Sequence, residues 1–563
     1  MSAKDGSEAP LGDGDALSPG NVGTGGTGRS VVLVALVVGA VTLARLVWLA
    51  IMPFDLYGDE AYYWHWSREL AFGYYSKPPM VAWVIAGTTA IGGNAEFWVR
   101  LGSPLLYAAT SLVVFSIGRR LYGDRTGLVA GAFFVTLPAV FVGGMVISTD
   151  APLLFFWALA LRAFIEAVHS NRWRWWVLTG VAGGLGMLSK YTMGVAALSC
   201  LLFLVLDPER RAYLRNPRLW GGAAIALLVF LPNLVWNAEN GFVSVLHLKH
   251  NADLGRDLVH PIRLLEFLAA HVALLGPVLF GVAVLLLVGL AGNRTTNPAD
   301  RLLFWFVVPM LALIGLLAFL SRAYANWAVP ALVAATIWAS AWLVRTRRWR
   351  LLWAGIAANL VLGLAVYGYE PVIQASGFTP NSRADPFKRL RGWREAAEQL
   401  RPALRRHPNA RLLGDDRIVL AQMVYYTRPL AVESAAVWNP TARTTDHYEL
   451  ATDIRADIGG DFIYVTERKK PPPGMRQAFA HVRPLQTIRV PMCADVDRRV
   501  NVLLLNGFRG YARRDTARRG QVSADPLAFS AQTTRITTGV NCRTDRVRHP
   551  DRPQDIASQG GLE

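Results

Sequence analysis

Long apolar runs separated by short polar segments dominate the first two thirds of the chain. The runs lie at Val31–Met52, 97–118, 126–147, 151–168, 175–189, 191–206, 219–236, 265–290, 302–320, 326–344 and 351–368. A membrane-spanning helix needs about 20 consecutive and mostly apolar residues. The pattern therefore predicts an α-helical polytopic membrane protein with about eleven transmembrane helices. The shorter run Pro79–Ile91 is typical of a re-entrant or interfacial helix.

The composition supports a membrane protein and argues against a nucleic-acid-binding protein. The chain is 53% hydrophobic and only 17% charged, with a net charge of +18. A strongly basic chain can bind nucleic acid, but here the basic residues alternate with the apolar runs and no nucleic-acid-binding motif accompanies them. We therefore expect no nucleic-acid partner and attribute the charge to membrane topology.

The charge of the loops predicts the orientation. With a cytoplasmic N-terminus, the inside loops hold 15 Lys and Arg residues and the longer outside loops hold 7. The inside loops are 119–125, 169–174, 207–218, 292–301 and 345–350, and the outside loops are 53–78, 146–150, 189–192, 237–263 and 321–325. Because positive residues favour the cytoplasmic side, this count agrees with the segmentation. Eleven spans then place the C-terminal region outside.

Changes in composition along the sequence divide the chain into four predicted parts. Residues 1–29 are rich in Gly, Ser and Asp and predict a disordered cytoplasmic segment. Residues 30–368 form the transmembrane domain, 369–512 a small extracytoplasmic α/β domain, and 513–563 a flexible Arg-rich tail. No internal repeat is present in the sequence.

Short patterned segments support the small α/β domain. Gly392–Leu400 predicts a helix, and three apolar segments predict short strands or buried stretches: Ile418–Tyr426, Asp461–Val465 and Val500–Leu505.

Three cysteines have different expected roles. Cys200 lies within an apolar run and is expected to be a small packing residue. Cys493 and Cys542 lie in the C-terminal region, where they can form a disulfide if that region is outside the cytoplasm.

The first outer loop carries three carboxylates, Asp55, Asp59 and Glu60, directly after the first span. The aromatic residues that follow are Tyr62, Tyr63, Trp64 and Trp66. Such rings favour the headgroup layer, so the loop predicts an interfacial helix at the membrane surface. Placing a carboxylate at the membrane surface costs free energy, so carboxylates at such positions usually have a function. Asp59 follows Gly58 at a helix start, so it is either an N-cap or a general base.

Three further outer positions carry charge at membrane edges. Lys77 precedes Pro78 and Pro79 at a helix start, which suits an anion site, or it reaches toward lipid headgroups. Asp150 stands at the outer start of a span, as a cap or as a functional acid. Lys190 ends a Gly-rich span, where it either extends toward the interface or faces the same site as Lys77. Together these residues provide acids and cations on one side of the membrane, as transfer from a lipid phosphate donor requires.

Other polar residues of the outer loops are candidates for substrate contacts. They are Tyr74, Tyr75, Tyr191, Asn237, His247, His250, Arg322, Asn326 and Trp327, with Asp55 as a secondary contact. The pair His247 and His250 could bind a divalent metal, but no third ligand is evident, so ordinary polar roles are preferred. No cofactor is assigned.

The order of the short motifs resembles that of the GT-C glycosyltransferases. The motifs are Asp59-Glu60, Lys77-Pro-Pro79, Thr149-Asp-Ala-Pro-Leu153, Gly184-Leu-Gly-Met-Leu-Ser-Lys-Tyr-Thr192, Trp236-Asn-Ala-Glu-Asn-Gly241 and Ala325-Asn-Trp-Ala-Val-Pro-Ala331. The chain is most similar to the protein mannosyltransferase-like and aminoarabinose transferase-like bacterial enzymes, families 39 and 83, over about residues 50–330. A looser match continues through Gly392-Trp393 and Tyr425-Tyr426.

The resemblance implies a hexosyl- or pentosyltransferase of the inner membrane of a bacterium, with a periplasmic active site. It implies a polyprenyl-phosphate-linked sugar as donor and inversion at the anomeric carbon. By position, Asp59 matches the catalytic aspartate, Glu60 its acidic neighbour and Asp150 the second acid. Lys77 matches the residue that contacts the donor phosphate, and Lys190 is expected beside it. The aminoarabinose enzymes carry Glu where this chain has Ser76, so the resemblance does not imply that sugar.

The acceptor is left open between two classes. Lipid A, lipopolysaccharide or another cell-envelope glycan suits the aminoarabinose-like features, and a Ser/Thr-containing protein suits the mannosyltransferase-like ones. The region 371–563, with 31 Lys and Arg against 20 Asp and Glu, would attract an anionic glycolipid or simply cap the bundle. The rival class is a transporter or lipid flippase, for which Arg45 and Arg162 inside spans are the supporting residues.

Overall fold

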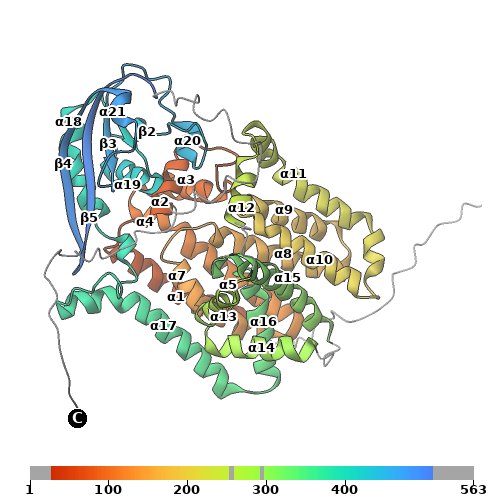
Figure 1. Ribbon diagram of the computed structural model, residues 1–563. Coiled ribbons are helices and arrows are strands. Elements are labelled where there is room, and N and C mark those ends of the chain that lie inside the picture. The colour runs from red at the N-terminus through yellow and green to blue at the C-terminus, as the bar shows by residue number, and fades with distance from the viewer. Residues whose placement is uncertain (1–26, 253–258, 292–296, 322, 512–563) are drawn as a thin grey trace, which may run out of the picture.

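A computed structural model describes residues 27–252, 259–291, 297–321 and 323–511. The predicted segments 1–29 and 513–563 lie largely or wholly outside these residues, as do Arg322 and Cys542. Within the described residues, neither Cys200 nor the buried Cys493 forms a disulfide, and the pairing of Cys493 with Cys542 stays a prediction. The expected helical membrane protein with a small C-terminal sheet domain is confirmed. The sheet domain contains β4 and β5, the long blue strands at the upper left of Figure 1.

Helices make up the first two thirds of the chain. Their bounds are α1 Thr27–Ile51, α2 Gly58–Trp66, α3 Met80–Gly92, α4 Glu96–Arg100, α5 Gly102–Tyr122, α6 Asp124–Thr136, α7 Pro138–Gly143, α8 Asp150–Ser170, α9 Trp173–Ser189, α10 Gly194–Leu206, α11 Pro217–Glu239, α12 Val243–Ala252, α13 Pro261–Leu275, α14 Pro277–Ala291, α15 Pro298–Leu320, α16 Ala331–Arg345 and α17 Trp349–Ser376. Among the described residues, six helical segments are long and apolar enough to cross a membrane: α1, α4 with α5, α8, α11, α15 and α17. Shorter apolar helices accompany them, so the count of eleven spans stays a prediction.

Two predicted spans are broken in the structure. The run 126–147 forms α6 and α7, because Pro138 starts a new helix after Leu137. The run 265–290 forms α13 and α14, which meet at Gly276 with φ +82°. A Cβ atom on Gly276 would lie 2.1 Å from Oδ1 of Asn359 in α17, so only glycine fits this close approach.

A five-stranded mixed sheet forms the centre of the C-terminal domain. The strands β1 Arg411–Gly414, β2 Ala435–Val437, β3 Phe462–Thr466, β4 Phe479–Cys493 and β5 Val496–Phe508 lie in the order β2-β1-β3-β5-β4. The first three pair in parallel, and β5 is antiparallel to both β3 and β4. The helices are α18 Trp393–Arg406, α19 Arg417–Thr427, α20 His447–Ala451 and α21 Met475–Ala478.

The predicted segments of this domain are confirmed, and in one of them the alternative of a buried stretch holds rather than that of a strand. The helix expected at 392–400 is α18, and the strands expected at 461–465 and 500–505 lie in β3 and β5. The segment 418–426 is not a strand but the helix α19, although it is buried as expected. Its N-cap Asp416 accepts hydrogen bonds from the backbone N–H groups of Ile418 and Val419, which starts the helix there.

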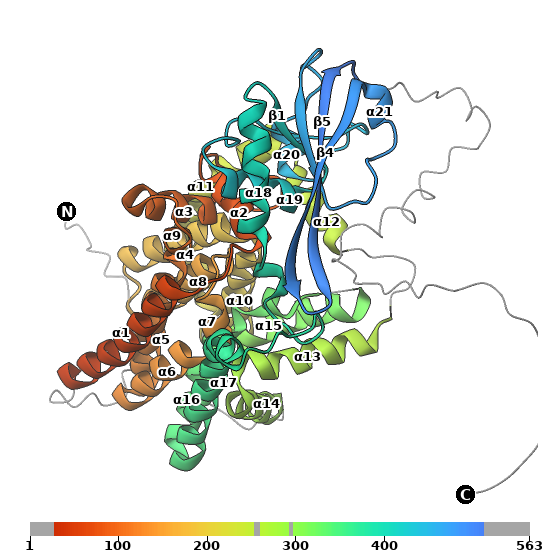
Figure 2. The ribbon, with the colours of Figure 1, turned by 90° about the vertical axis from the view of Figure 1, so that its left-hand side faces the viewer.

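The sheet domain shares one hydrophobic core with the first outer loop. Figure 2 shows it against α2, α3 and α4 at one end of the bundle. Buried residues of the loop, such as Leu56 and Trp64, pack in the same cluster as Leu420 and Tyr425 of α19. The two parts therefore form a continuous packed unit, and the residues between them are held in fixed positions.

Candidate active site

The first turn of α2 sits where the helical bundle meets the sheet domain. Gly58 starts the helix, and a Cβ atom there would lie 2.4 Å from Cγ2 of Ile418 in α19. The glycine thus allows α19 to approach α2 closely. As a consequence, the N-terminal ends of both helices come together around the predicted acidic residues.

Glu60 is locked in a buried ion pair. Its side chain is 1% exposed, and both oxygens accept hydrogen bonds from Arg100 of α4, at 2.8 to 3.2 Å. The backbone N–H groups of Tyr57 and Ile147 also donate to it, at 2.8 and 2.9 Å. No acceptor capacity is left facing a substrate, so the contacts of Glu60 are those of a structural residue.

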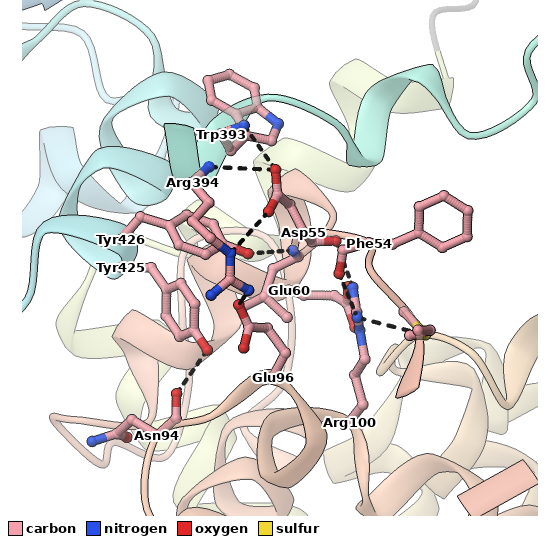
Figure 3. A network of polar contacts seen from close by, with 12 residues as sticks. Phe54, Asp55, Glu60, Asn94, Glu96, Arg100, Trp393, Arg394, Tyr425 and Tyr426 are labelled. Carbon is pink, nitrogen blue, oxygen red and sulfur yellow. Dashed lines mark hydrogen bonds and ion pairs between the residues drawn. The ribbon is translucent and has the colours of Figure 1, made fainter. Parts of the chain in front are cut away.

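Asp55 has a comparable structural environment. Its Oδ2 accepts hydrogen bonds from the backbone N–H groups of Trp393 and Arg394, at 2.8 and 3.3 Å, and so caps α18 (Figure 3). The carboxylate is 6% exposed. Burial and the charge of Glu395 raise its pKa to about 6, although the two backbone donors act against this shift. Asp55 therefore joins the two domains, and the expected substrate contact is not supported by its position.

Asp59 is the accessible carboxylate of the loop. Its side chain is 37% exposed, and Oδ1 lies 3.3 Å from Nη1 of Arg417, the first residue of α19. No other ion pair or hydrogen bond of the Asp59 side chain is formed with the described residues. A carboxylate held by a single cation and open to solvent retains the lone pairs that a general base needs.

Lys77 lies beside the same acids, in the loop before α3. No hydrogen bond or ion pair reaches its ammonium group from the described part of the chain. Burial, together with the nearby charges of Lys190 and Arg417, lowers its pKa to about 8, and the attraction of Asp59 and Asp150 does not cancel this effect. A crowded ammonium without a partner is suited to an anionic ligand.

Asp150 and Lys190 form a second, more buried pair. Nζ of Lys190 is 2.6 Å from Oδ1 of Asp150, and Nδ2 of Asn326 donates to Oδ2 at 3.2 Å. Their side chains are 12% and 11% exposed. The structure therefore brings Lys190 near Lys77, as predicted, but its charge is already compensated by Asp150.

Tyr63 of α2 lies near enough to both Asp59 and Asp150 to feel their charges. Burial and the nearby charges of Asp59 and Asp150 raise the pKa of its hydroxyl. Asp59, Lys77, Asp150, Lys190 and Arg417 thus surround one region, which we call the charge cluster. Arg417 was not predicted from the sequence; the Asp416 cap was its only local signal, and it indicates a helix start rather than a site.

The predicted substrate-contact residues divide into two groups around this region. Tyr74 is 1% exposed, donates to the carbonyl oxygens of Trp66 and Glu69, and stacks on Trp66, which are structural contacts. The rings of Tyr75 and His247 pack edge to face, with their centroids 5.1 Å apart. Trp327 packs at the edge of the bundle core.

The second group lies on α11 and the segment before α10. The hydroxyl of Tyr191 donates to Oδ1 of Asn233 and accepts from Nδ2 of Asn237, at 3.3 and 3.4 Å. Asn237 keeps a buried side-chain oxygen without a hydrogen-bond partner among the described residues. The side chain of His250 and the whole of Arg322 lie outside the described residues, so their predicted roles stay predictions.

Two sequence expectations need correction or qualification here. The rings of Tyr62, Trp64 and Trp66 are at most 3% exposed and pack under the sheet domain, so the expectation that they face the headgroup layer is wrong. Within the described ranges, no three His, Cys, Asp or Glu residues converge in a way that could hold a metal. The two acids of the charge cluster each face a side-chain cation instead.

Each of the two arginines inside predicted spans has at least one partner in the bundle. Arg162 donates to Glu166 and Ser116, at 2.7 and 2.9 Å. Arg45 donates to the carbonyl oxygen of Val135 and lies over the ring of Phe141. The contacts of Arg162 are those of helix packing, whereas Nε and Nη1 of Arg45 are buried without a hydrogen-bond partner among the described residues.

Comparisons with known proteins agree with this architecture. The family model described as dolichyl-phosphate-mannose-protein mannosyltransferase matches residues 76–236. Lipid A galacturonosyltransferase RgtD of Rhizobium johnstonii is 33% identical over 441 residues, which cover 77% of this chain and 90% of the relative. Lipopolysaccharide core galacturonosyltransferase RgtA of the same organism is 26% identical over 55% of this chain and 64% of the relative.

Among solved structures, ArnT from Cupriavidus metallidurans bound to undecaprenyl phosphate superposes with a TM-score of 0.58. The match covers 85% of this chain and 98% of that chain, at 16% sequence identity. This likeness shows a shared fold, including the arrangement of a helical bundle and a C-terminal domain.

Proposed function

The chain belongs to the GT-C glycosyltransferases, and on this basis we propose that it transfers a sugar from a polyprenyl-phosphate donor to lipid A or a related lipopolysaccharide acceptor. The sugar we propose is galacturonic acid, since the relative that matches over 90% of its own length is a lipid A galacturonosyltransferase. The observation that carries the proposal is the accessible carboxylate of Asp59 beside Lys77, whose ammonium has no hydrogen-bond or ion-pair partner within the described ranges.

The reaction that suits this geometry is a direct displacement. The acceptor hydroxyl loses its proton to the Asp59 carboxylate while its oxygen attacks the anomeric carbon. The bond between that carbon and the phosphate oxygen breaks, the configuration inverts, and polyprenyl phosphate leaves. Lys77, whose own surroundings are largely buried, stabilises the charge that develops on the leaving phosphate. In this proposal, the displacement does not involve a metal ion.

The pair of Asp150 and Lys190 has a supporting role in this proposal. Their mutual 2.6 Å contact fixes the outer ends of α8 and α9 behind Lys77, and Asn326 adds a contact from the loop after α15. The charge of Lys190 also helps keep the pKa of Lys77 near 8. We assign these residues to shaping the phosphate site, with Tyr75, Tyr191 and Asn237 nearby as candidate contacts.

The orientation belongs to the same proposal. The excess of Lys and Arg in the predicted inside loops supports a cytoplasmic N-terminus and an inner-membrane location. The charge cluster and the sheet domain then face the periplasm, where a lipid A acceptor would be presented.

A protein acceptor is the second candidate. It is favoured by one observation, the match of residues 76–236 to the protein mannosyltransferase model. The longer similarity to the lipid A enzyme, over 77% of the chain, favours the lipid acceptor.

The proposal is tested with the purified full-length protein in lipid nanodiscs. It is given polyprenyl-phosphate galacturonic acid with lipid A, or polyprenyl-phosphate mannose with a Ser/Thr peptide. We expect galacturonosylated lipid A and polyprenyl phosphate by mass spectrometry from the first mixture only. Product from the second mixture alone would establish the protein acceptor, and product from neither would contradict the proposed function.

A further inference from the structure

Arg417 is the one cation of the charge cluster that comes from the sheet domain. It follows β1 at the carboxyl end of the parallel strands, the edge of the sheet that faces α2. The Asp416 cap and the close contact of Gly58 with Ile418 fix the start of α19 against the start of α2. The backbone of Arg417 is therefore as firmly placed as that of Asp59.

The guanidinium group itself is only loosely engaged. It lies 3.3 Å from Asp59 through one nitrogen and 5.2 Å above the ring centre of Tyr62. No hydrogen bond from its side chain is formed with the described residues, and 40% of the side chain is exposed. Burial acts to lower the pKa of Arg417, but the carboxylates of Asp59 and Asp446 raise it overall, so the group stays charged.

Arg100 gives the contrast. Its side chain is 1% exposed and donates to Glu60 and to the carbonyl oxygens of Phe54 and Asp55, at 2.7 to 3.2 Å. A guanidinium carries five N–H donors in a planar fork that matches a carboxylate or a phosphate. Arg100 uses this fork within the protein, whereas Arg417 leaves most of it open, directly beside the proposed base.

We propose that Arg417 binds an oxyanion of the donor, and that it pairs with Asp59 only while the site is empty. The oxyanion is either the carboxylate of the uronic acid or the phosphate of the lipid carrier. This inference rests on the proposed function, because it concerns the donor of that reaction. The donor is thus held between Lys77 of the membrane domain and Arg417 of the sheet domain.

One consequence is an order of events. While Arg417 pairs with Asp59, one lone pair of the carboxylate is engaged. When the donor draws the guanidinium away, Asp59 is released to accept the proton of the acceptor hydroxyl. The sheet domain therefore contributes directly to the donor site, and donor binding leaves both oxygens of the Asp59 carboxylate available to the acceptor hydroxyl.

The test uses Arg417→Gln and Arg417→Lys in the full-length protein, with Arg483→Gln as the control. Arg483 is exposed on β4, and its side chain forms no hydrogen bond or ion pair with the described residues. We expect Arg417→Gln to raise the KM for the galacturonosyl donor at least about tenfold, since a lost charge-assisted contact has about this effect. Turnover at saturating donor should change much less. Arg417→Lys, which keeps the charge without the fork, should restore part of the loss.

A second measurement identifies the oxyanion. The affinity of each variant for polyprenyl phosphate, which lacks the sugar, is measured by product inhibition. If Arg417→Gln raises the donor KM and leaves this affinity unchanged, the ligand is the sugar carboxylate. If both weaken together, the ligand is the phosphate.

The inference is overturned if neither Arg417→Gln nor Arg417→Lys changes the donor KM while the wild-type protein transfers the sugar. A wild-type protein without transfer would instead contradict the proposed function, so the two failures are distinguishable. If Arg417→Gln lowers the melting temperature of the protein, Arg417→Lys alone decides the question. If the donor KM of Arg417→Lys then equals that of the control Arg483→Gln, Arg417 does not bind the donor oxyanion.

Discussion

Asp59 and Glu60 are neighbours in the first turn of α2, yet they belong to two different regions of the molecule. Glu60 points into the junction beneath the sheet domain, where Arg100 and two backbone N–H groups bind it and water is excluded. Asp59 points into the charge cluster and keeps one 3.3 Å contact with Arg417. Of these two adjacent carboxylates, Glu60 therefore has a structural role and Asp59 a proposed chemical one. The difference between them comes from the groups that surround each side chain.

The comparison shows why acidity alone does not identify a base. A buried carboxylate with every lone pair occupied contributes to stability, and its removal leaves an unpaired charge in the interior. A half-exposed carboxylate with one weak contact contributes little to stability, and it remains free to accept a proton. The two residues should therefore respond in opposite ways to the same substitution.

The largest effect is expected for Asp59→Asn. The amide cannot accept the acceptor proton, so turnover should fall by about 10²–10⁴-fold, the usual contribution of general base catalysis. The melting temperature should stay unchanged. Asp457→Asn is the matched control, because Asp457 forms a similarly exposed pair with Arg411 in the sheet domain. Turnover near the wild-type rate in Asp59→Asn would remove this residue from the mechanism.

Glu60→Gln should show the reverse pattern. Loss of one partner from a buried pair destabilises a protein by about 3–5 kcal/mol, because the charge of Arg100 is left unpaired. Thermal unfolding in detergent measures this, and turnover per folded molecule should remain within a few-fold of the wild type. The double variant with Arg100→Gln should recover part of the stability. An unchanged melting temperature with a large loss of turnover would show that Glu60 is catalytic.

A smaller effect is expected when the pH is raised, because kcat/KM depends on the protonation of Lys77. Because its pKa is lowered to about 8, the ammonium is charged below this pH and neutral above it. A neutral amine no longer attracts the donor phosphate, so kcat/KM should fall about tenfold per pH unit above pH 8. Lys77→Arg should remove this alkaline limb, since a guanidinium stays protonated there. An identical alkaline limb in the variant would assign the titration to another group.

Much of the fold is predictable because membrane spans have a strong local pattern. The apolar runs, the helix α18 and the strands β3 and β5 are all apparent from hydrophobic periodicity. The errors arise where local and tertiary signals differ. The run 418–426 has the buried character of a strand, but the Asp416 cap and packing on α2 make it a helix. The breaks at Pro138 and Gly276 depend on a backbone conformation that hydropathy does not record.

The candidate site was predicted only in part, for a related reason. Lys77, Asp150 and Lys190 were expected on one side of the membrane, and the structure brings them together with Asp59. The pairing of Asp150 with Lys190 and that of Glu60 with Arg100 connect positions 40 residues apart, which no local pattern identifies. Arg417 is more distant still, because it comes from another domain.

The sequence by itself determined the class of protein, the sites of its apolar helices and the set of charged residues available at the outer surface. These depend on local composition and on the cost of placing polar groups in lipid. Only the tertiary structure decided which carboxylate is occupied and which is free. The packing of α19 on α2 buries the rings of the first outer loop and places Arg417 beside Asp59. The first turn of α18 engages Asp55, and Arg100 of α4 engages Glu60. The availability of a charged group for chemistry is set by its neighbours in space, and those neighbours come from distant parts of the chain.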